Sequence, residues 1–343
     1  MNPCVSPLIE AINHSTEKRL WIVDENITPA VIAGINSRGN LSAITNRCDI
    51  GRALQQRGIN AIVNDFDFSS LTDVTGIVYR ISKERLLAQH CIAEAHRILT
   101  LNGTLSLFGE KNDGIKTLGK FASTLFANDM HYEKLGQCYC VQLTRSTSAT
   151  TTTFEDSYNT LQLIQQNDVE FYSKPGIYGW KKVDIGSRLL IETIKPLLTG
   201  MATKSLSLLD LGCGYGYLLM QLAQLPFRQM IATDNSATAM VAVTKNVSWQ
   251  QLSATLLLGD CAEGLAQPID IIVCNPPFHQ GFGHDKHLIT RFINRSLELL
   301  SANGQAFFVV NEFIGLEKTV SQLNGSSTSL AHQNGFKVYR ITR

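Results

Sequence analysis

Four consecutive residues that follow an apolar run, Asn275, Pro276, Pro277 and Phe278, have the types needed to hold a planar amino group. Two successive prolines lack backbone donors and have a fixed φ, so they form a stiff turn whose carbonyl groups remain available as acceptors. The side-chain oxygen of Asn275 and the carbonyl of Pro276 could each accept an N–H from a conjugated amine. Such hydrogen bonds localise the nitrogen lone pair, which the nitrogen needs in order to attack a methyl group.

Methylation of an amine of this kind depends on positioning and oriented dipoles, because the nitrogen loses its proton only after the attack. Phe278 would provide the surface on which a planar, extruded base stacks. The alternative explanation is a proline-stiffened strand exit with a buried Phe. A general base is not required, so His279 is expected to be a hydrogen-bonded loop residue. We therefore predict that residues 275–278 are catalytic and modify an exocyclic amino group.

A glycine-rich turn lies upstream, where residues 208–217 read LLDLGCGYGY. Gly212, Gly214 and Gly216 would let the backbone turn sharply and approach a ligand beside the N-terminus of the next helix. A dinucleotide fingerprint would have its third glycine at position 217, which is Tyr217 here. The spacing therefore argues against a dehydrogenase.

Acidic residues follow the same strand pattern. Asp210 precedes the glycine turn, Asp234 ends the next expected strand, and Asp260 ends the one after that. A carboxylate at the position of Asp234 can accept both hydroxyls of a ribose, and one at the position of Asp260 can accept from an adenine amino group. Each Asp alone is more often a helix cap. Their common place at the carboxyl edge of one sheet favours a nucleoside-containing cofactor.

The elements that must position these residues alternate between short β-branched runs and longer helical patterns, as in an open, mostly parallel α/β sheet. In the second half the expected strands are 206–211, 230–233, 255–258, 269–274, 306–310 and 337–341. In the first half they are 19–23, 61–63, 75–79 and 103–108. Residues 144–153 read TRSTSATTTT and resemble a linker, so we predict domains at 1–150 and 151–343.

The two halves also resemble each other. Residues 76–110 and 270–312 each contain an apolar strand, a polar loop, an amphipathic helix, an Asn-Gly turn and a second apolar strand, which indicates a duplication. Where the second half has the tetrad, the first has Arg80, Ile81, Ser82 and Lys83, and it contains no glycine-rich turn after its opening strand. The first half is therefore expected to be a scaffold without a cofactor site.

The overall composition limits the number of domains and the ways in which the protein could bind nucleic acid. The 343 residues are 44% hydrophobic, which suffices for two cores, and 30 Lys and Arg against 29 Asp and Glu give a net charge of +1. Nucleic-acid contacts would therefore depend on local patches. Six basic residues are candidate phosphate contacts: Lys181, Lys182, Arg188, Lys286, Arg291 and Arg295. The more ordinary explanation for each of them is a solvated helix face.

Eight cysteines are scattered without a C-x-x-C pair, so we expect no metal site and a reducing environment. The sequence contains no charged leader and no apolar run long enough to span a membrane. These features predict a soluble cytoplasmic protein that does not associate with membranes.

With the glycine turn, Asp234, Asp260 and the tetrad, the second half resembles the class I, seven-stranded S-adenosylmethionine (SAM)-dependent methyltransferases. More closely, it is similar to the ribosomal RNA guanine-N2 methyltransferases of the RsmC type, which act on 16S rRNA of the small subunit. PGIY at 175–178, VDIGSRLL at 183–190, His279 and FKVYR at 336–340 carry the closer resemblance. The first half resembles the family only in its order of strands and helices. That family has a degenerate, duplicated methyltransferase domain at its N-terminus.

The resemblance implies two tandem Rossmann-like domains, each a mostly parallel seven-stranded sheet flanked by helices, with the N-terminal one degenerate and available for RNA docking. It implies that the tetrad holds a guanine of 16S rRNA in the assembled small subunit, and that the protein is a monomer. The residues it assigns to SAM are Asp210, Gly212, Gly214, Gly216, Asp234, Asp260 and Asn275.

One departure from the family is visible, because Gly179 and Trp180 replace the usual Ser-Arg after Gly-Ile-Tyr. A sister group with the same tetrad modifies a guanine of 23S rRNA and remains an alternative. Protein-glutamine and adenine-N6 methyltransferases more often have Tyr at the last position of the tetrad. An alternative of another class is a non-catalytic RNA-binding or assembly factor.

Overall fold

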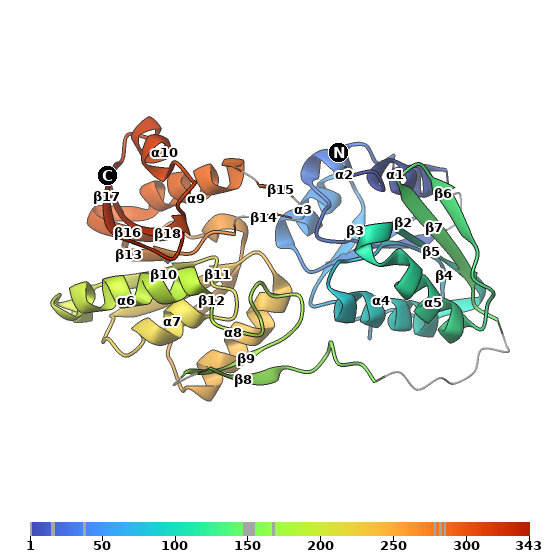
Figure 1. The fold of residues 1–343 in the computed structure, drawn as a ribbon, viewed down its shortest axis with the longest axis horizontal. Coiled ribbons are helices and arrows are strands. Elements are labelled where there is room, and N and C mark those ends of the chain that lie inside the picture. Colours follow the sequence, from blue (N-terminus) through green and yellow to red (C-terminus); the bar gives the residue numbers. More distant parts are fainter. Residues whose placement is uncertain are drawn as a thin grey trace. The chain divides into compact units, whose positions relative to one another are not determined.

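The computed structural model describes residues 2–14, 18–36, 39–146, 155–166, 169–277, 279–280, 283–284 and 286–343. The chain separates into two compact units, Met1–Thr160 and Leu161–Arg343, which are described one at a time (Figure 1). Among the helices of the described ranges, none is long and apolar enough to cross a membrane.

The N-terminal unit is built around a seven-stranded sheet. Its strands are β1 (Arg19–Ile22), β2 (Leu41–Thr45), β3 (Asn60–Val63), β4 (Val74–Arg80), β5 (Leu99–Glu110), β6 (Tyr132–Leu135) and β7 (Cys138–Thr144). Its helices are α1 (Val5–Asn13), α2 (Pro29–Ala33), α3 (Cys48–Gln56), α4 (Arg85–Ile98), α5 (Ile115–Phe126) and the 3₁₀ turn η1 (Lys111–Asp113). The strand order is β3-β2-β1-β4-β5-β7-β6, and only β7 runs against its neighbours.

Helices cover both faces of this sheet. One buried cluster joins strand side chains to α4 and α5, and a second joins the alternate strand side chains to α1, α2 and α3 (Figure 1). Leu20 and Ile22 belong to the first cluster, and Trp21 and Val23 to the second. A strand that is apolar on both faces is typical of a parallel sheet enclosed between two helical layers.

The C-terminal unit repeats this plan. Its strands are β8 (Gln162–Gln166), β9 (Val169–Ser173), β10 (Ser207–Leu211), β11 (Gln229–Asp234), β12 (Thr255–Leu258), β13 (Ile269–Cys274), β14 (His279–Gln280), β15 (Gly283–His284), β16 (Leu300–Asn311), β17 (Ser326–Gln333) and β18 (Phe336–Thr342). Its helices are α6 (Ile185–Thr199), α7 (Tyr217–Leu222), α8 (Ala237–Trp249), α9 (Lys286–Leu299), α10 (Leu316–Gln322) and the 3₁₀ turns η2 (Thr203–Ser205) and η3 (Asp260–Ala262).

The main sheet of this unit has the order β12-β11-β10-β13-β16-β18-β17, with β18 antiparallel, while β8 with β9 and β14 with β15 form separate hairpins. One cluster packs α6, α7 and α8 on one face, and another packs α9 and α10 on the other (Figure 1). Both units thus confirm the predicted fold class of two tandem, mostly parallel α/β domains.

The strand registers of the two units correspond residue by residue. Val74 pairs with Leu99 and Gly76 with Thr104, and the same irregularity recurs where Ile269 pairs with Leu300 and Ile271 with Gln305. In both units a 14-residue helix leads directly into a 12-residue strand with the same burial pattern. This agreement supports the predicted duplication and aligns Arg80 with Asn275.

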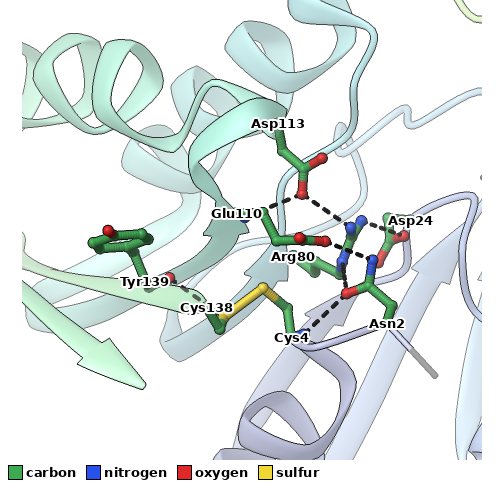
Figure 2. The surroundings of a disulfide bond; sticks show 8 residues. All are labelled: Asn2, Cys4, Asp24, Arg80, Glu110, Asp113, Cys138 and Tyr139. Carbon is green, nitrogen blue, oxygen red and sulfur yellow. Dashed lines mark hydrogen bonds and ion pairs between the residues drawn. A yellow bond between two sulfur atoms is a disulfide. The ribbon is translucent and has the colours of Figure 1, made fainter. Parts of the chain in front are cut away.

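A buried ion cluster lies at the end of β4. The guanidinium of Arg80 donates to Asp24 at 3.2 Å and to Asp113 at 3.0 Å, and its Nε donates to Asn2 Oδ1 at 3.2 Å (Figure 2). The side chain of Arg80 is fully buried, and burial raises the pKa of Asp24 to about 6 although Arg80 lowers it. The guanidinium is therefore ion-paired with two buried carboxylates at the position where the other unit has an amide.

The N-terminal segment is anchored at the same place. Cys4 and Cys138 form a disulfide that joins the start of α1 to β7, and the backbone N–H of Cys4 donates to Asn2 Oδ1 at 2.9 Å (Figure 2). The disulfide differs from the expectation of a reducing environment, in which cysteines stay unpaired. The two cysteines are separated by 134 positions in the sequence, and this spacing gave no reason to pair them.

We expect R80M to destabilise the N-terminal unit by roughly 3–5 kcal/mol, because removal of one member of a buried ion cluster leaves the others uncompensated. Calorimetric unfolding of the full chain measures the effect, with R85M as the matched control at an exposed position. Equal unfolding temperatures for R80M and R85M would contradict the importance of the cluster.

Candidate active site

Asn275 directly follows β13, which lies between β10 and β16 in the middle of the sheet. Its Nδ2 donates to Asp184 Oδ1 and to Ser187 Oγ, both at 2.8 Å. Since a carboxylate only accepts, the amide must turn its nitrogen toward Asp184. The Oδ1 of Asn275 is then left buried, with no hydrogen-bond partner among the described residues. The side chain therefore presents a single, fixed acceptor.

Asp184 holds this amide while it also caps a helix. It is the N-cap residue of α6, and its Oδ1 accepts from the backbone N–H of Ser187 at 2.9 Å. Gly186 permits the close packing, because a Cβ there would lie 3.0 Å from the ring of Phe336 and 3.1 Å from Asp184 Oδ1. Sequence reasoning did not assign Asp184 and Ser187 to the site. The available signal was the Asp-x-x-Ser start of an amphipathic helix.

The remaining residues of the tetrad are described in part. Pro276 is buried and Pro277 is exposed, and both continue the turn that leaves β13. Phe278 lies outside the described residues, as do the side chains of His279 and Lys286. The predicted stacking role of Phe278 therefore stays a prediction.

The glycine turn follows β10 and has left-handed backbone at φ +79° for Gly212, +55° for Gly214 and +90° for Gly216. A Cβ at Gly216 would lie 2.7 Å from Val243, whereas one at Gly214 would meet no atom closer than 3.9 Å. The backbone N–H groups of Gly212 and Cys213 both donate to the carbonyl of Thr233, at 2.9 and 3.0 Å. The turn is thus attached to β11 by two hydrogen bonds, and the space beside Gly214 is left open for a ligand.

Asp234 completes the attachment of this turn. Its Oδ2 accepts from Gly214 N and its Oδ1 from Ser236 N, both at 2.9 Å. Desolvation nevertheless raises the pKa of Asp234 above its ordinary value. Each carboxylate oxygen retains a further lone pair, so Asp234 can shape the turn and still accept from ribose hydroxyls.

Asp210 lies beneath the turn and is fully buried. One oxygen accepts from the backbone N–H of Leu219 at 3.0 Å, and the other has no partner among the described residues. Burial raises the pKa of Asp210 to about 7. Its observed contact supports the first turn of α7, and its unpartnered oxygen is a further acceptor near the glycines.

Asp260 begins η3, and the next residue, Cys261, has a left-handed backbone with φ +48°. A carboxylate oxygen of Asp260 is ion-paired with Arg291, and Arg295 donates to the backbone carbonyls of Ala262 and Leu265. These two arginines, considered above as phosphate contacts, are therefore engaged within the unit.

The sheet order brings the predicted residues to one edge. From β12 to β13, consecutive neighbouring strands end at Asp260, Asp234, the glycine turn and Asn275. In the described ranges, no group of three or more His, Cys, Asp or Glu side chains could hold a metal ion. The edge offers carboxylate and amide acceptors, which suit hydroxyl and amino groups of a nucleoside.

The N-terminal unit has different side chains at the corresponding positions. By strand register Trp21 corresponds to Asp210, Thr45 to Asp234 and Arg80 to Asn275. Asp65, which corresponds to Asp260, accepts from the hydroxyl of Tyr158 at 2.7 Å. A guanidinium cannot accept from an amine, and an indole cannot accept from a hydroxyl.

The raised pKa of Asp210 yields a pH prediction. The folded chain holds this proton up to about pH 7, whereas an unfolded Asp loses it near 3.8, so the stabilisation by protonation disappears as pH rises through 7. D210N keeps the acceptor for Leu219 and carries no charge. We expect its unfolding free energy to exceed that of the wild type at pH 8, by an amount on the order of 2–4 kcal/mol that shrinks toward pH 5. Urea unfolding at several pH values measures this, and parallel curves would contradict it.

Comparisons with known proteins agree with this geometry. Residues 168–340 match the Methyltransferase small domain family. Ribosomal RNA small subunit methyltransferase C of Stutzerimonas stutzeri is 30% identical over 244 residues, which are 70% of each protein. The protein of the same name from Shewanella amazonensis is 28% identical over 268 residues, covering 77% of this chain and 76% of that protein.

A solved structure shares the whole fold. The Thermus thermophilus 16S rRNA N2 methyltransferase RsmC, in complex with AdoMet and guanosine, has a TM-score of 0.84 and 24% identity, and the match covers 100% of this chain and 92% of that one. The two-unit architecture is therefore that of a known methyltransferase. The chain belongs to the Methyltransferase small domain family and, within it, to the ribosomal RNA small subunit methyltransferase C family.

Proposed function

We propose that the protein transfers a methyl group from S-adenosylmethionine to the exocyclic N2 of a guanine in 16S rRNA. The observation that carries this proposal is the buried Oδ1 of Asn275, which has no hydrogen-bond partner among the described residues and whose amide is held in one orientation by Asp184 and Ser187. A buried acceptor without a hydrogen bond costs free energy in the free protein, and a substrate that donates an N–H would supply the missing hydrogen bond.

The substrate amine is activated by these acceptors. The lone pair of guanine N2 is delocalised into the ring, and hydrogen bonds to Asn275 Oδ1 and to the carbonyl of Pro276 draw the nitrogen toward tetrahedral geometry. As the new N–C bond forms, the bond between the methyl carbon and sulfur breaks and its electron pair stays on the sulfur, which becomes a neutral thioether. The amine gains the positive charge, and its extra proton leaves to water. Positioning by a stiff turn replaces general base catalysis in this scheme.

The acceptors at the sheet edge fit the cofactor. Bound S-adenosylmethionine supplies an electrophilic methyl group attached to a positively charged sulfur. Asp234 and Asp260 would hold its ribose hydroxyls and adenine amino group, and the open space beside Gly214 admits close approach of a ligand. Asp210, Gly212 and Gly216 would complete the cofactor site, and Asn275 would lie at its boundary with the substrate.

The relatives support the substrate assignment. Those named above are small subunit enzymes, which favours 16S rRNA over the 23S rRNA of the sister group. The intact acceptor of Asn275 and the pinned glycine turn disfavour a non-catalytic assembly factor. The assembled small subunit is the proposed substrate, the cytoplasm the proposed location, and a monomer the proposed state.

The N-terminal unit has a separate role in this proposal. Trp21, Thr45 and Arg80 stand where the other unit has its acceptors, so residues of this unit would hold no cofactor. We assign it to stabilisation of the chain and to docking of RNA. The proposed domains are thus a degenerate unit at 1–150 and a catalytic unit at 151–343.

We expect N275A to lower the rate of methyl transfer by roughly 10²-fold or more while SAM affinity stays nearly unchanged, because the lost acceptor acts on the transition state. D184N should lower the rate of methyl transfer by less than N275A does. The acceptor of Asn275 is retained in this variant, but an amide at position 184 no longer fixes its orientation. Single-turnover transfer from labelled SAM to small subunits measures both rates.

The matched control is N294A, which removes an exposed amide on α9 that bonds only to nearby Glu298 in the described contacts. Mass spectrometry of the digested rRNA identifies the methylated base. Turnover of N275A at the level of N294A would refute the mechanism, and methyl groups on another base would refute the substrate.

We further expect one SAM molecule per full-length chain and, for D234N, at least about tenfold weaker binding, because an amide cannot accept from both backbone groups and the ribose as the carboxylate does. Titration calorimetry gives both quantities. Two molecules per chain would assign a cofactor site to the N-terminal unit, and an unchanged affinity in D234N would contradict the role of Asp234.

A further inference from the structure

Three apolar side chains stand out on the surface of the C-terminal unit. Phe313 is 87% exposed, Tyr178 72% and Ile185 52%, the highest values for large apolar residues among those described in this unit. Single exposed apolar residues are common on soluble proteins, so exposure alone would not be informative. All three, however, belong to segments at the edge of the sheet where the strands end at the glycine turn and Asn275.

Tyr178 and Ile185 are linked to the site through Asp184. Ile185 is the first residue of α6 and follows Asp184, whose carboxylate accepts from Asn275 Nδ2 at 2.8 Å. Tyr178 follows Ile177, whose Cγ2 would lie 3.9 Å from a Cβ at Gly214, and desolvation together with the negative charge of Asp184 raises the pKa of Tyr178. Ile185 therefore lies beside the fixed amide, and the loop of Tyr178 lies beside the glycine turn at the same edge of the sheet.

Phe313 reaches the same rim from the neighbouring strand. Cys274, which precedes Asn275, pairs with Phe308 of β16, and β16 ends at Asn311, two residues before Phe313. Asn311 also pairs with Phe336, whose ring packs on Gly186 between the two residues that hold Asn275.

The turn that carries Phe313 is fixed. The backbone N–H of Phe313 donates to Asn311 Oδ1 at 3.1 Å, and the N–H of Ile314 donates to the carbonyl of Asn311 at 3.0 Å. A side chain so exposed on an ordered turn is available for binding without a large entropic cost.

We propose that Tyr178, Ile185 and Phe313 form a flanking-base rim that contacts the RNA bases on either side of the target guanine. The inference rests on the proposed function and adds the mode of substrate recognition. A base that enters the site leaves the stack, and its neighbours lose their stacking partner. Aromatic surfaces at the rim replace that partner for any base, because every base has a flat apolar face.

Charge at the rim suits an RNA strand. Lys181 and Lys182 are exposed in the same loop as Tyr178, and Lys181 Nζ lies 4.9 Å from the ring centroid of Trp180. This contact orients one ammonium group beside the rim. Two lysines next to exposed aromatic side chains are the combination that binds single-stranded RNA, with the bases on the rings and the phosphates on the charges.

The test compares F313A with L197A, a truncation of another exposed apolar residue, on α6 away from the rim, and with F313W. The substrates are a small subunit and a short single-stranded RNA carrying the target guanine, the latter also with abasic sites on both sides of it. We expect F313A to raise KM by about 5- to 150-fold with kcat and SAM affinity unchanged, and F313W to restore KM. On the abasic RNA, wild type and F313A should have equal KM.

A second measurement is independent of methyl transfer. With 2-aminopurine beside the target guanine, stacking on the rim should quench its fluorescence in wild type and in L197A but less in F313A. Equal quenching and equal KM for F313A and L197A would overturn the rim while the proposed function stands. Absence of guanine methylation by the wild type would instead overturn the proposed function.

Discussion

An amide side chain donates at one end and accepts at the other, and both donor hydrogens of Asn275 are already used by Asp184 and Ser187. The acceptor end is consequently fixed, and within the described part of the chain it is buried without a hydrogen-bond partner. An unsatisfied buried acceptor costs free energy in the free protein. The arrangement is stable only because β13 and α6 are both held rigidly by the two helical layers around the sheet, so the fold is what keeps the amide ready.

The two units show how one sheet can serve two purposes. At the strand end where the C-terminal unit has Asn275, the N-terminal unit has Arg80, which forms ion pairs with Asp24 and Asp113 and bonds to Asn2. A guanidinium has donors only, so this position cannot recognise an amine. In place of an edge with free acceptors, the N-terminal unit has a buried ion cluster, and the strand registers remain the same.

Much of the framework could be predicted from the sequence because its strands are short apolar runs between helical patterns, and the glycine turn and tetrad are local motifs. The strand β17 was missed because Ser326–Gln333 is polar, as an edge strand can be. Leu41–Thr45 and the hairpin β8–β9 were also missed, since mixed polar and apolar residues give no clear period.

The contacts that finish the site could not be predicted in the same way. Asp184 and Asn275 are 91 positions apart in the sequence, so their hydrogen bond could not be predicted from a local motif. The ion pair of Arg291 with Asp260 likewise depends on the tertiary packing of α9 against η3. A local motif gives the kind of chemistry, whereas the orientation of an amide depends on neighbours that only the folded chain brings together.

The double role of Asp184, as N-cap of α6 and as anchor of Asn275, links helix fraying to the reactive geometry. When the first turn of α6 opens, the carboxylate leaves and the amide is free to rotate, so its nitrogen can occupy the place of its oxygen. The population of reactive molecules then equals the closed fraction of one helical turn. Solutes or temperatures that loosen helix ends would thus reduce the reactive fraction well before global unfolding.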